Sequence, residues 1–303
     1  MRTINELLKT AVVRYSERIA FIEPEDEGRM VSLTYNDLLE QVHGFAGALQ
    51  EKGLKKGDRL LIWSASRIDW MVAFFGTLLI GAVVVPLDIN SKEELLSKIE
   101  QSTEAIYLIT SQKLYSGLKQ PHAPLIDIDA LPQSRLEMAA IPEIYGDDLA
   151  ELVFTSGTTG QPKGVMLSHL NITSDAIAAV TFVNILKDDR ALSILPLSHM
   201  FELTIEIAIL YVGASVVYAR TLSPDTLLKL FASEHVTCMV LVPQALQLFL
   251  NGIERQVRQQ KKEKQWEVLH RIAQRLPFRF RRVLFWQVHK RFGGNFHFFV
   301  SGG

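Results

Sequence analysis

The sequence predicts an α/β fold in which helices cover largely parallel sheets. Apolar strand-like runs alternate with amphipathic helical segments along most of the 303 residues, at the spacing typical of βαβ units. Hydrophobic residues make up 48% and charged residues 21%, a composition that excludes general disorder. A chain of this length forms one large domain or two ordinary ones, and we expect two subdomains, 1–147 and 148–303.

The first subdomain is expected to begin with a helix and then alternate strands and helices. Helices are predicted over residues 4–15, 35–52, 70–80 and 91–102, and strands over 59–63, 83–85 and 105–109. Thr34 is the expected N-cap of the second helix and Ser91 that of the fourth. Residues 70–87 carry no charge and approach membrane-spanning length, but Gly81 and Pro86 favour a core helix followed by a buried strand. Residues 111–147 contain four prolines and are expected to form a connection.

The second subdomain continues the same alternation. Strands are predicted over residues 149–154, 165–167, 191–195, 214–218 and 237–242. Helices are predicted after Ser168 and His169, over 201–211 and 225–233, and from Pro243 onward, where proline suits the first helical position. Cys238, the only cysteine, lies in the last of these strands and is expected to be a core residue, so an internal disulfide and a multi-cysteine zinc site are excluded.

A glycine-rich loop from Thr155 to Gly164 gives the strongest functional signal. It contains three glycines, four hydroxyl side chains and one lysine in ten residues. Glycines let several backbone N–H groups approach one anion, hydroxyls add donors, and lysine adds a positive charge. The spacing fits neither the common nucleotide-triphosphatase loop nor the dinucleotide-binding turn. The loop is therefore predicted to bind a polyphosphate, with a plain flexible turn as the alternative.

Several segments resemble one enzyme family. Residues 152–169, LVFTSGTTGQPKGVMLSH, closely resemble the phosphate loop of the adenylate-forming (AMP-binding) superfamily. Residues 33–35 and 81–87 resemble its earlier core segments, and 195–202, LPLSHMFE, and 292–303, FGGNFHFFVSGG, resemble those of long-chain fatty-acid–CoA ligases. The resemblance covers nearly the whole chain, most weakly over 111–147 and 254–282. It implies two packed αβαβα-type subdomains, as in the large N-terminal domain of these enzymes.

The resemblance also implies a reaction. Such enzymes use ATP and Mg²⁺ to convert a carboxylic acid into an acyl-adenylate, and coenzyme A then takes the acyl group as a thioester. By this resemblance Lys163 and His199 are the catalytic candidates, and Thr155 or Thr158 is the hydroxyl on the Mg²⁺ side. The residues assigned to ATP are Thr155, Ser156, Gly157, Thr158, Thr159, Gly160 and Lys163, with Gly302 and Gly303 on the adenine and acyl side.

Other interpretations stay open at this stage. The acid is expected to be a long-chain fatty acid, because residues 198–202 lack the aspartate with which amino-acid-activating relatives hold an amine. Alternatives are an acyl-ACP synthetase, a fatty acyl-AMP ligase, an aryl-CoA ligase, or a non-catalytic nucleotide- or acyl-binding module. His199 is alternatively a locally hydrogen-bonded residue, and Phe201, Leu203 and Ile207 line an acyl tunnel or form ordinary core. Because the family's downstream motifs are absent, we expect an amino-terminal part that is inactive alone.

Charge is distributed unevenly along the chain. The whole chain carries a net charge of -1, so no global field attracts nucleic acid, and none is expected as a partner. Residues 254–291 alone carry +9, with aromatic residues interleaved. Such a segment is typical of a solvated helical face or of one that lies on an anionic membrane. No signal-peptide core occurs near Met1, and the expected location is cytoplasmic, with peripheral contact at the inner membrane face.

Overall fold

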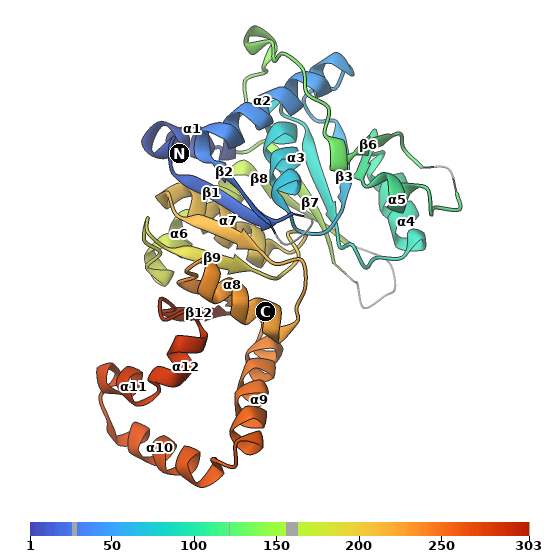
Figure 1. The fold of residues 1–303 in the computed structure, drawn as a ribbon. Coiled ribbons are helices and arrows are strands. Elements are labelled where there is room, and N and C mark those ends of the chain that lie inside the picture. The colour runs from blue at the N-terminus through green and yellow to red at the C-terminus, as the bar shows by residue number, and fades with distance from the viewer. Residues whose placement is uncertain (26–28, 121, 156–162, 303) are drawn as a thin grey trace. The chain divides into compact units, whose positions relative to one another are not determined.

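The computed structural model describes residues 1–25, 29–120, 122–155 and 163–302, and Figure 1 traces the chain from end to end. The chain divides into two compact units. The first unit comprises residues 1–188 and 195–215, and the second comprises residues 189–194 and 216–303. The predicted subdomain boundary between residues 147 and 148 stays a prediction.

The first unit begins with a helix, a β-hairpin and a second helix. These are α1 (Ile4–Tyr15), β1 (Ile19–Pro24), β2 (Met30–Thr34) and α2 (Tyr35–Glu51), and the antiparallel pair β1–β2 was not predicted. The expected N-cap at Thr34 is confirmed: its hydroxyl accepts from the Asp37 N–H while Asp37 accepts from the Thr34 N–H. This capping box satisfies two backbone donors that the helix itself leaves unpaired.

The main sheet of the first unit is mostly parallel. It contains β3 (Arg59–Trp63), β4 (Val83–Leu87), β5 (Tyr107–Thr110), β6 (Leu125–Asp127), β7 (Leu149–Thr155) and β8 (Lys163–Ser168), in the order β6-β5-β3-β4-β7-β8. Only β8 runs antiparallel to its neighbour, β7. Parallel strands need crossover connections, and helices supply them here. The carboxyl ends of β3, β4, β5, β6 and β7 therefore meet at one edge.

Helices pack against this sheet. They are α3 (Ile68–Leu79), α4 (Glu93–Thr103) and the short α5 (Gln112–Tyr115), with single 3₁₀ turns at Ile128–Ala130 and Met138–Ala140. Leu96 and Ile99 of α4 form a buried cluster with Leu61, Val85 and Leu108 on one sheet face. The prediction that Ser91 caps α4 was wrong, because the Ser91 N–H bonds to the Asp88 carbonyl in a turn and Lys92 takes the cap position.

Two further helices complete the first unit, α6 (His169–Val183) and α7 (Met200–Val212). The uncharged run 70–87 forms most of α3 and then β4, which confirms the predicted core helix and buried strand. No helix in the described part of the chain is both long and apolar enough to cross a bilayer.

Gly213 ends α7 at φ +83°, and a Cβ there would lie 2.6 Å from the Tyr15 ring, so this position requires glycine.

The second unit holds another sheet and a series of helices. Its strands are β9 (Arg190–Ser193), β10 (Ser215–Tyr218), β11 (Cys238–Leu241) and β12 (Phe298–Ser301), in the order β12-β11-β9-β10. Its helices are α8 (Pro224–Ser233), α9 (Pro243–Gln259), α10 (Glu263–Arg275), α11 (Phe278–Leu284) and α12 (Trp286–Arg291). Cys238 is buried as predicted, and burial raises the pKa of its thiol to about 12. The α/β class with mostly parallel sheets is confirmed.

Candidate functional site

The carboxyl edge of the main sheet gathers several sequence-predicted residues. Strand β4 pairs in parallel with β7 through Val84 and Glu151. Asp88 and Thr155 each lie four residues beyond this pair, so the register leads both to the same edge. Ligands of parallel α/β sheets bind at such carboxyl edges, because the loops leaving neighbouring strands converge there.

A β-hairpin extends from this edge. Its strands β7 and β8 pair up to Thr155 and Lys163, which are cross-strand partners at the base of the glycine-rich loop. Both side chains are exposed, so a hydroxyl and an ammonium group face solvent on adjacent strands. The structure thus brings together two of the predicted phosphate-binding residues. The other predicted members of the loop lie outside the described residues: Ser156, Gly157, Thr158, Thr159 and Gly160.

His199 lies directly before α7, at its N-cap position, and close to an aspartate at the same sheet edge. Its Nε2 atom is 3.5 Å from Oδ2 of Asp88, the residue that follows β4. The Asp88 carbonyl in turn accepts a hydrogen bond of 3.1 Å from the Trp63 indole. The His199 side chain is 63% exposed, so this contact leaves most of the imidazole accessible to a ligand.

A serine holds the segment that leads to His199. The Ser66 hydroxyl donates to the Leu195 carbonyl at 3.0 Å and accepts from the Leu197 N–H at 2.9 Å. These two bonds attach the strand-to-helix connection to the loop after β3 and restrict the backbone immediately before His199. Backbone fixed in this way next to a candidate ligand-binding residue reduces the motion that binding would otherwise have to suppress.

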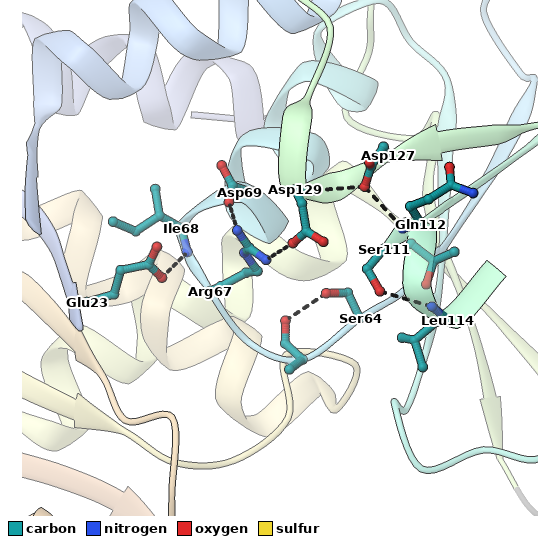
Figure 2. A network of polar contacts seen from close by, with 12 residues as sticks. Glu23, Ser64, Arg67, Ile68, Asp69, Ser111, Gln112, Leu114, Asp127 and Asp129 are labelled. Carbon is teal, nitrogen blue, oxygen red and sulfur yellow. Dashed lines mark hydrogen bonds and ion pairs between the residues drawn. The ribbon is translucent and has the colours of Figure 1, made fainter. Parts of the chain in front are cut away.

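The loop that carries Ser66 is itself fixed by ion pairs (Figure 2). The Arg67 guanidinium contacts Asp69 at 2.5 Å and Asp129 at 2.6 Å, and thereby joins the start of α3 to the chain after β6. Next to it, the Ile68 N–H donates to the Glu23 carboxylate at 3.1 Å. Burial lowers the pKa of Arg67, but the two carboxylates outweigh this effect and raise it, so the guanidinium stays charged. The network therefore holds the loop after β3 in one position at this sheet edge.

Two ionisable groups, one in the hairpin and one directly after it, are buried. Glu151 of β7 is fully buried, and neither of its carboxyl oxygens has a hydrogen-bond partner in the described part of the chain. Burial raises its pKa to about 8, so the neutral form prevails at neutral pH. His169, the first residue of α6, is also buried, and burial lowers its pKa to about 4. Its Nδ1 accepts from the Ile4 N–H at 3.4 Å, a role that suits a neutral imidazole.

Other sequence-predicted residues lie in the core of the first unit or in the second unit. Leu203 and Ile207 are fully buried in α7, which packs against α1 and α6, and this burial favours the core interpretation over a ligand-lining one. Gly302 follows β12 in the second unit, and its N–H bonds to the Leu241 carbonyl at 3.4 Å. Gly303 lies outside the described residues.

The described residues contain no group of three histidine, cysteine, aspartate or glutamate side chains placed to hold a metal ion. The Thr155 hydroxyl, which the sequence suggested for the Mg²⁺ side, is exposed at the hairpin base.

Sequence reasoning missed two residues that the structure brings to the site, Asp88 and Ser66. Asp88 directly follows a fully buried strand, and polar residues at the carboxyl ends of parallel strands are candidates for ligand sites. That signal was available from the sequence. Ser66 carried no comparable signal, because its role depends on a contact with Leu195, 129 residues away along the chain.

Comparison with known proteins identifies the relatives of this chain. The family described as "AMP-binding enzyme" matches residues 8–303. A long-chain-fatty-acid–[acyl-carrier-protein] ligase, AEE15, from Arabidopsis thaliana is 24% identical over 84% of this chain and 40% of its own length. A crotonobetaine/carnitine–CoA ligase from Proteus mirabilis is 26% identical over 78% of this chain and 50% of its own length. The chain thus spans half the length, or less, of these two relatives.

Solved structures share the fold. The N-terminal subdomain of NpsA from Klebsiella oxytoca, in complex with 3-hydroxybenzoyl-AMSN, matches with a TM-score of 0.72 and 26% identity. That match covers 83% of this chain and 62% of the NpsA chain. The N-terminal domain of FACL13 from Mycobacterium tuberculosis matches with a TM-score of 0.73 and 24% identity, over 82% of this chain and 65% of the other. Both neighbours are amino-terminal portions of their proteins, as their names state.

Proposed function

The chain belongs to the AMP-binding enzyme family, and on that premise we propose that it is part of an enzyme that activates a long-chain carboxylic acid with ATP. In the proposed reaction the acid becomes an acyl-adenylate, and a thiol then takes the acyl group. The observation that carries the proposal is the pairing of Thr155 with Lys163 at the base of the glycine-rich loop, on the carboxyl edge of the sheet.

The first step brings two anions together. A carboxylate oxygen attacks the α-phosphorus of ATP, the bond from that phosphorus to the bridging oxygen breaks, and pyrophosphate leaves with the electron pair. Lys163 is proposed to neutralise the charge that develops on the departing phosphates, while the loop's backbone N–H groups hold them in line. Mg²⁺, when bound, would screen the same oxygens, with the Thr155 hydroxyl as one ligand.

His199 and Asp88 are proposed to face the acid. Their contact of 3.5 Å orients the imidazole, whose exposed part is proposed to contact the acyl carboxylate or the adenylate. The Ser66 bonds fix the backbone shortly before His199, and the Arg67 network fixes the loop that carries Ser66, so the segment is in place before the ligand arrives. Such preorganisation lowers the free-energy barrier, because little reordering remains at the transition state.

The thiol acceptor is proposed to be coenzyme A. One relative is named as a ligase that uses coenzyme A and another as a ligase that uses an acyl carrier protein, so the acceptor is tested directly in the assay below. A long-chain fatty acid is proposed as the substrate because the LPLSHMFE segment resembles that subgroup. Aryl acids are the alternative that the NpsA neighbour suggests. The cytoplasmic location stays a prediction.

Acid-dependent exchange of labelled pyrophosphate into ATP tests the proposal on the complete gene product. We expect exchange with long-chain acids, and about 100-fold slower exchange for Lys163→Ala, the usual loss when one transition-state donor is removed. Lys113→Ala, at an exposed lysine of α5, is the matched control and should keep full exchange. Unchanged exchange in the Lys163 variant would remove the role proposed for this lysine. Adding coenzyme A or carrier protein then identifies the acceptor.

Peripheral membrane contact is also proposed, through the basic segment 254–291. The segment carries +9, and it exposes the apolar side chains of Val268, Ile272, Phe280, Val283 and Trp286. Trp286 lies under the Lys290 ammonium group, 5.8 Å from the ring centroid, so cation and aromatic ring share one surface. Basic side chains attract anionic headgroups, and exposed apolar side chains insert between them.

Sedimentation with phosphatidylglycerol vesicles tests this contact. We expect salt-sensitive binding, and at least tenfold weaker binding for Val283→Asp, because the change removes an apolar contact and adds repulsion. Phe182→Asp is the control, since Phe182 is 88% exposed on α6, outside the basic segment. Equal binding to neutral and anionic vesicles, or equal loss in both variants, would contradict the proposal.

A further inference from the structure

The helices of the second unit border a cavity of about 770 Å³. This volume lies within the range of about 300–1,000 Å³ that is usual for small-molecule sites. Among the described residues, those that line it all belong to the second unit, whereas Thr155, Lys163 and His199 belong to the first. The cavity is therefore a separate candidate site, to which the proposed catalytic residues do not contribute.

Its walls are mostly apolar and aromatic, and the amide side chains of Asn251, Gln260, Gln265 and Gln287 also line it. They are formed by α8, α9, α10 and the residues around α12, through side chains that include Leu227, Phe249, Trp266, Leu269, Phe285 and Val288. Ring contacts hold the walls together: Trp266 meets Phe285 edge-on at 5.5 Å, and Phe249 lies 6.1 Å from Phe292. Apolar walls disfavour a nucleotide or sugar, whose polar groups would lose hydrogen bonds to water on entering. The lining fits a hydrocarbon chain.

The charged residues at the cavity have an excess of one sign. Arg255, Lys262 and Arg291 line it with exposed side chains, against one carboxylate, Asp225. Exposed cations next to an apolar interior complement a molecule with a long apolar chain and one anionic end. A neutral hydrocarbon would use the interior without the basic rim, and a small polyanion would use the rim without the interior.

We propose that this cavity binds a free long-chain carboxylic acid, with its hydrocarbon chain among the aromatic walls and its carboxylate at the basic rim. The identification of this acid with the enzyme's substrate rests on the proposed function, while the cavity itself requires only an apolar chain with an anionic end. The basic segment 254–291, proposed as the membrane surface, supplies part of the cavity lining, including Trp266, Leu269 and Trp286, so an acid leaving a bilayer would meet the cavity on the protein.

Tryptophan fluorescence can locate the ligand. Two of the four tryptophans, Trp266 and Trp286, line the cavity, and Trp63 and Trp70 belong to the first unit. A brominated fatty acid quenches an indole ring on contact, so 12-bromododecanoate, used below its micelle concentration, is the probe. An acid bound beside His199 can also quench Trp63, whose indole bonds to the Asp88 carbonyl. We therefore expect a saturable component of the quenching that is lost when Trp266 and Trp286 are both replaced by phenylalanine. Quenching of the complete gene product that is unchanged by this replacement would overturn the proposal.

The dependence of affinity on the length of the acid's hydrocarbon chain gives a second test. Each buried methylene group contributes a roughly constant free energy, which corresponds to about fourfold in affinity. Competition with dodecanoate, decanoate and octanoate should therefore show affinities that fall by about 16-fold for each pair of methylenes removed. Affinity that does not change with chain length would show that the carboxylate alone is recognised and would overturn the proposal.

A matched pair of variants on α10 tests whether the cavity wall contacts the bound acid. Leu269 lines the cavity, whereas its neighbour Val268 is 50% exposed and does not line it. Leu269→Glu should weaken 12-bromododecanoate binding at least tenfold, and Val268→Glu should change it less than twofold. Leu269→Phe, which keeps the wall apolar but reduces the space, should shift the preference toward shorter acids. Equal effects at positions 268 and 269, with circular dichroism unchanged, would overturn the proposal.

Pyrophosphate exchange on the same preparations separates this inference from the proposed function. Acid-dependent exchange without quenching of Trp266 and Trp286 would overturn the cavity proposal and leave the activation reaction standing. Saturable quenching without exchange for any acid would leave the cavity site standing and overturn the proposed function.

Discussion

The main sheet of the first unit and the helices α9–α12 of the second use their apolar residues in different ways. Strand β4 is buried throughout, and β3 is buried except at Arg59. By contrast, Ala273 is the one buried residue among those of α10, and Val268, Val283 and Trp286 are at least half exposed. One region is a closed core, and the other presents apolar surface outward and toward a cavity.

This difference corresponds to the two kinds of ligand proposed. Phosphate chemistry needs donors and charges held in fixed positions, and a buried parallel sheet with hydrogen-bonded loops supplies such a scaffold. An apolar chain or a membrane needs apolar surface that the fold has not already used. We therefore expect the sheet region to respond strongly to substitutions and pH, and the helical region to respond weakly in stability but strongly in binding.

The largest expected effect concerns Glu151 in the sheet. Its pKa is raised to about 8 in the fold, above the value of 4.5 for the free side chain, so unfolding releases a proton between these pH values. The group's contribution to stability is therefore complete below pH 4.5 and is lost as pH rises toward 8. Glu151→Gln should gain stability over the parent across this window, up to about 5 kcal/mol at pH 8, at about 1.4 kcal/mol per pH unit.

Urea unfolding of the parent and the Gln variant at pH 5, 6.5 and 8 measures this gain. A difference in unfolding free energy that is constant across pH would show that the carboxyl group already ionises inside the fold. The sheet interior would then hold water or another group that stabilises the ionised carboxylate. The sheet region would in that case differ less from the helical region.

His169 should produce the next largest effect, with the opposite sign. Its pKa falls to about 4 in the fold from 6.5 in the free side chain, so the unfolded chain binds a proton first as pH falls. Stability is complete above pH 6.5 and declines by up to about 3 kcal/mol as pH approaches 4. Thermal unfolding of His169→Gln should lack this decline. A decline that remains in the variant would assign the pH dependence to other groups.

The two slopes oppose each other between pH 4.5 and 6.5, where Glu151 lowers stability with rising pH and His169 raises it. The parent protein should therefore show a nearly flat profile in this range from these two groups, and each single variant should reveal the slope of the other. A double variant with both slopes absent provides the control.

The smallest expected effect concerns the exposed side of α10. Val268→Ala removes atoms that are half exposed, so the unfolding free energy should change by no more than about 0.5 kcal/mol. Leu61→Ala, at a fully buried position of β3, is the comparator and should lose about 2–5 kcal/mol. Urea unfolding of both variants measures the difference. A loss above 1 kcal/mol at Val268, which is about twice the expected limit, would show that this face is covered in solution.

Most elements were predictable where the apolar pattern had a clear period. The helix over 4–15 and the strand over 59–63 were predicted at their observed bounds, and Pro243 does begin α9. The hairpin β1–β2 was missed, because its strands alternate only weakly between buried and exposed positions. Strand β6 was missed because only three residues pair with β5, in a region where prolines interrupt the pattern.

Some features of the candidate site could be predicted from the sequence, and others could not. The loop from Thr155 to Gly164 could be recognised from sequence because its chemistry is contiguous. The pairing of His199 with Asp88 could not, since these residues lie 111 positions apart and meet through the sheet order. The cavity in the second unit was equally hidden, because a stripe of apolar residues does not show whether it faces a core, a ligand or water.

Residue order alone determined the α/β class, the glycine-rich composition of the loop from Thr155 to Gly164 and the basic character of residues 254–291, because each depends on neighbours along the chain. Tertiary structure decided which polar groups became buried without partners, which loop fixes the backbone shortly before His199, and where the fold leaves space among its helices. These properties depend on contacts between residues far apart in sequence, and packing determines those contacts.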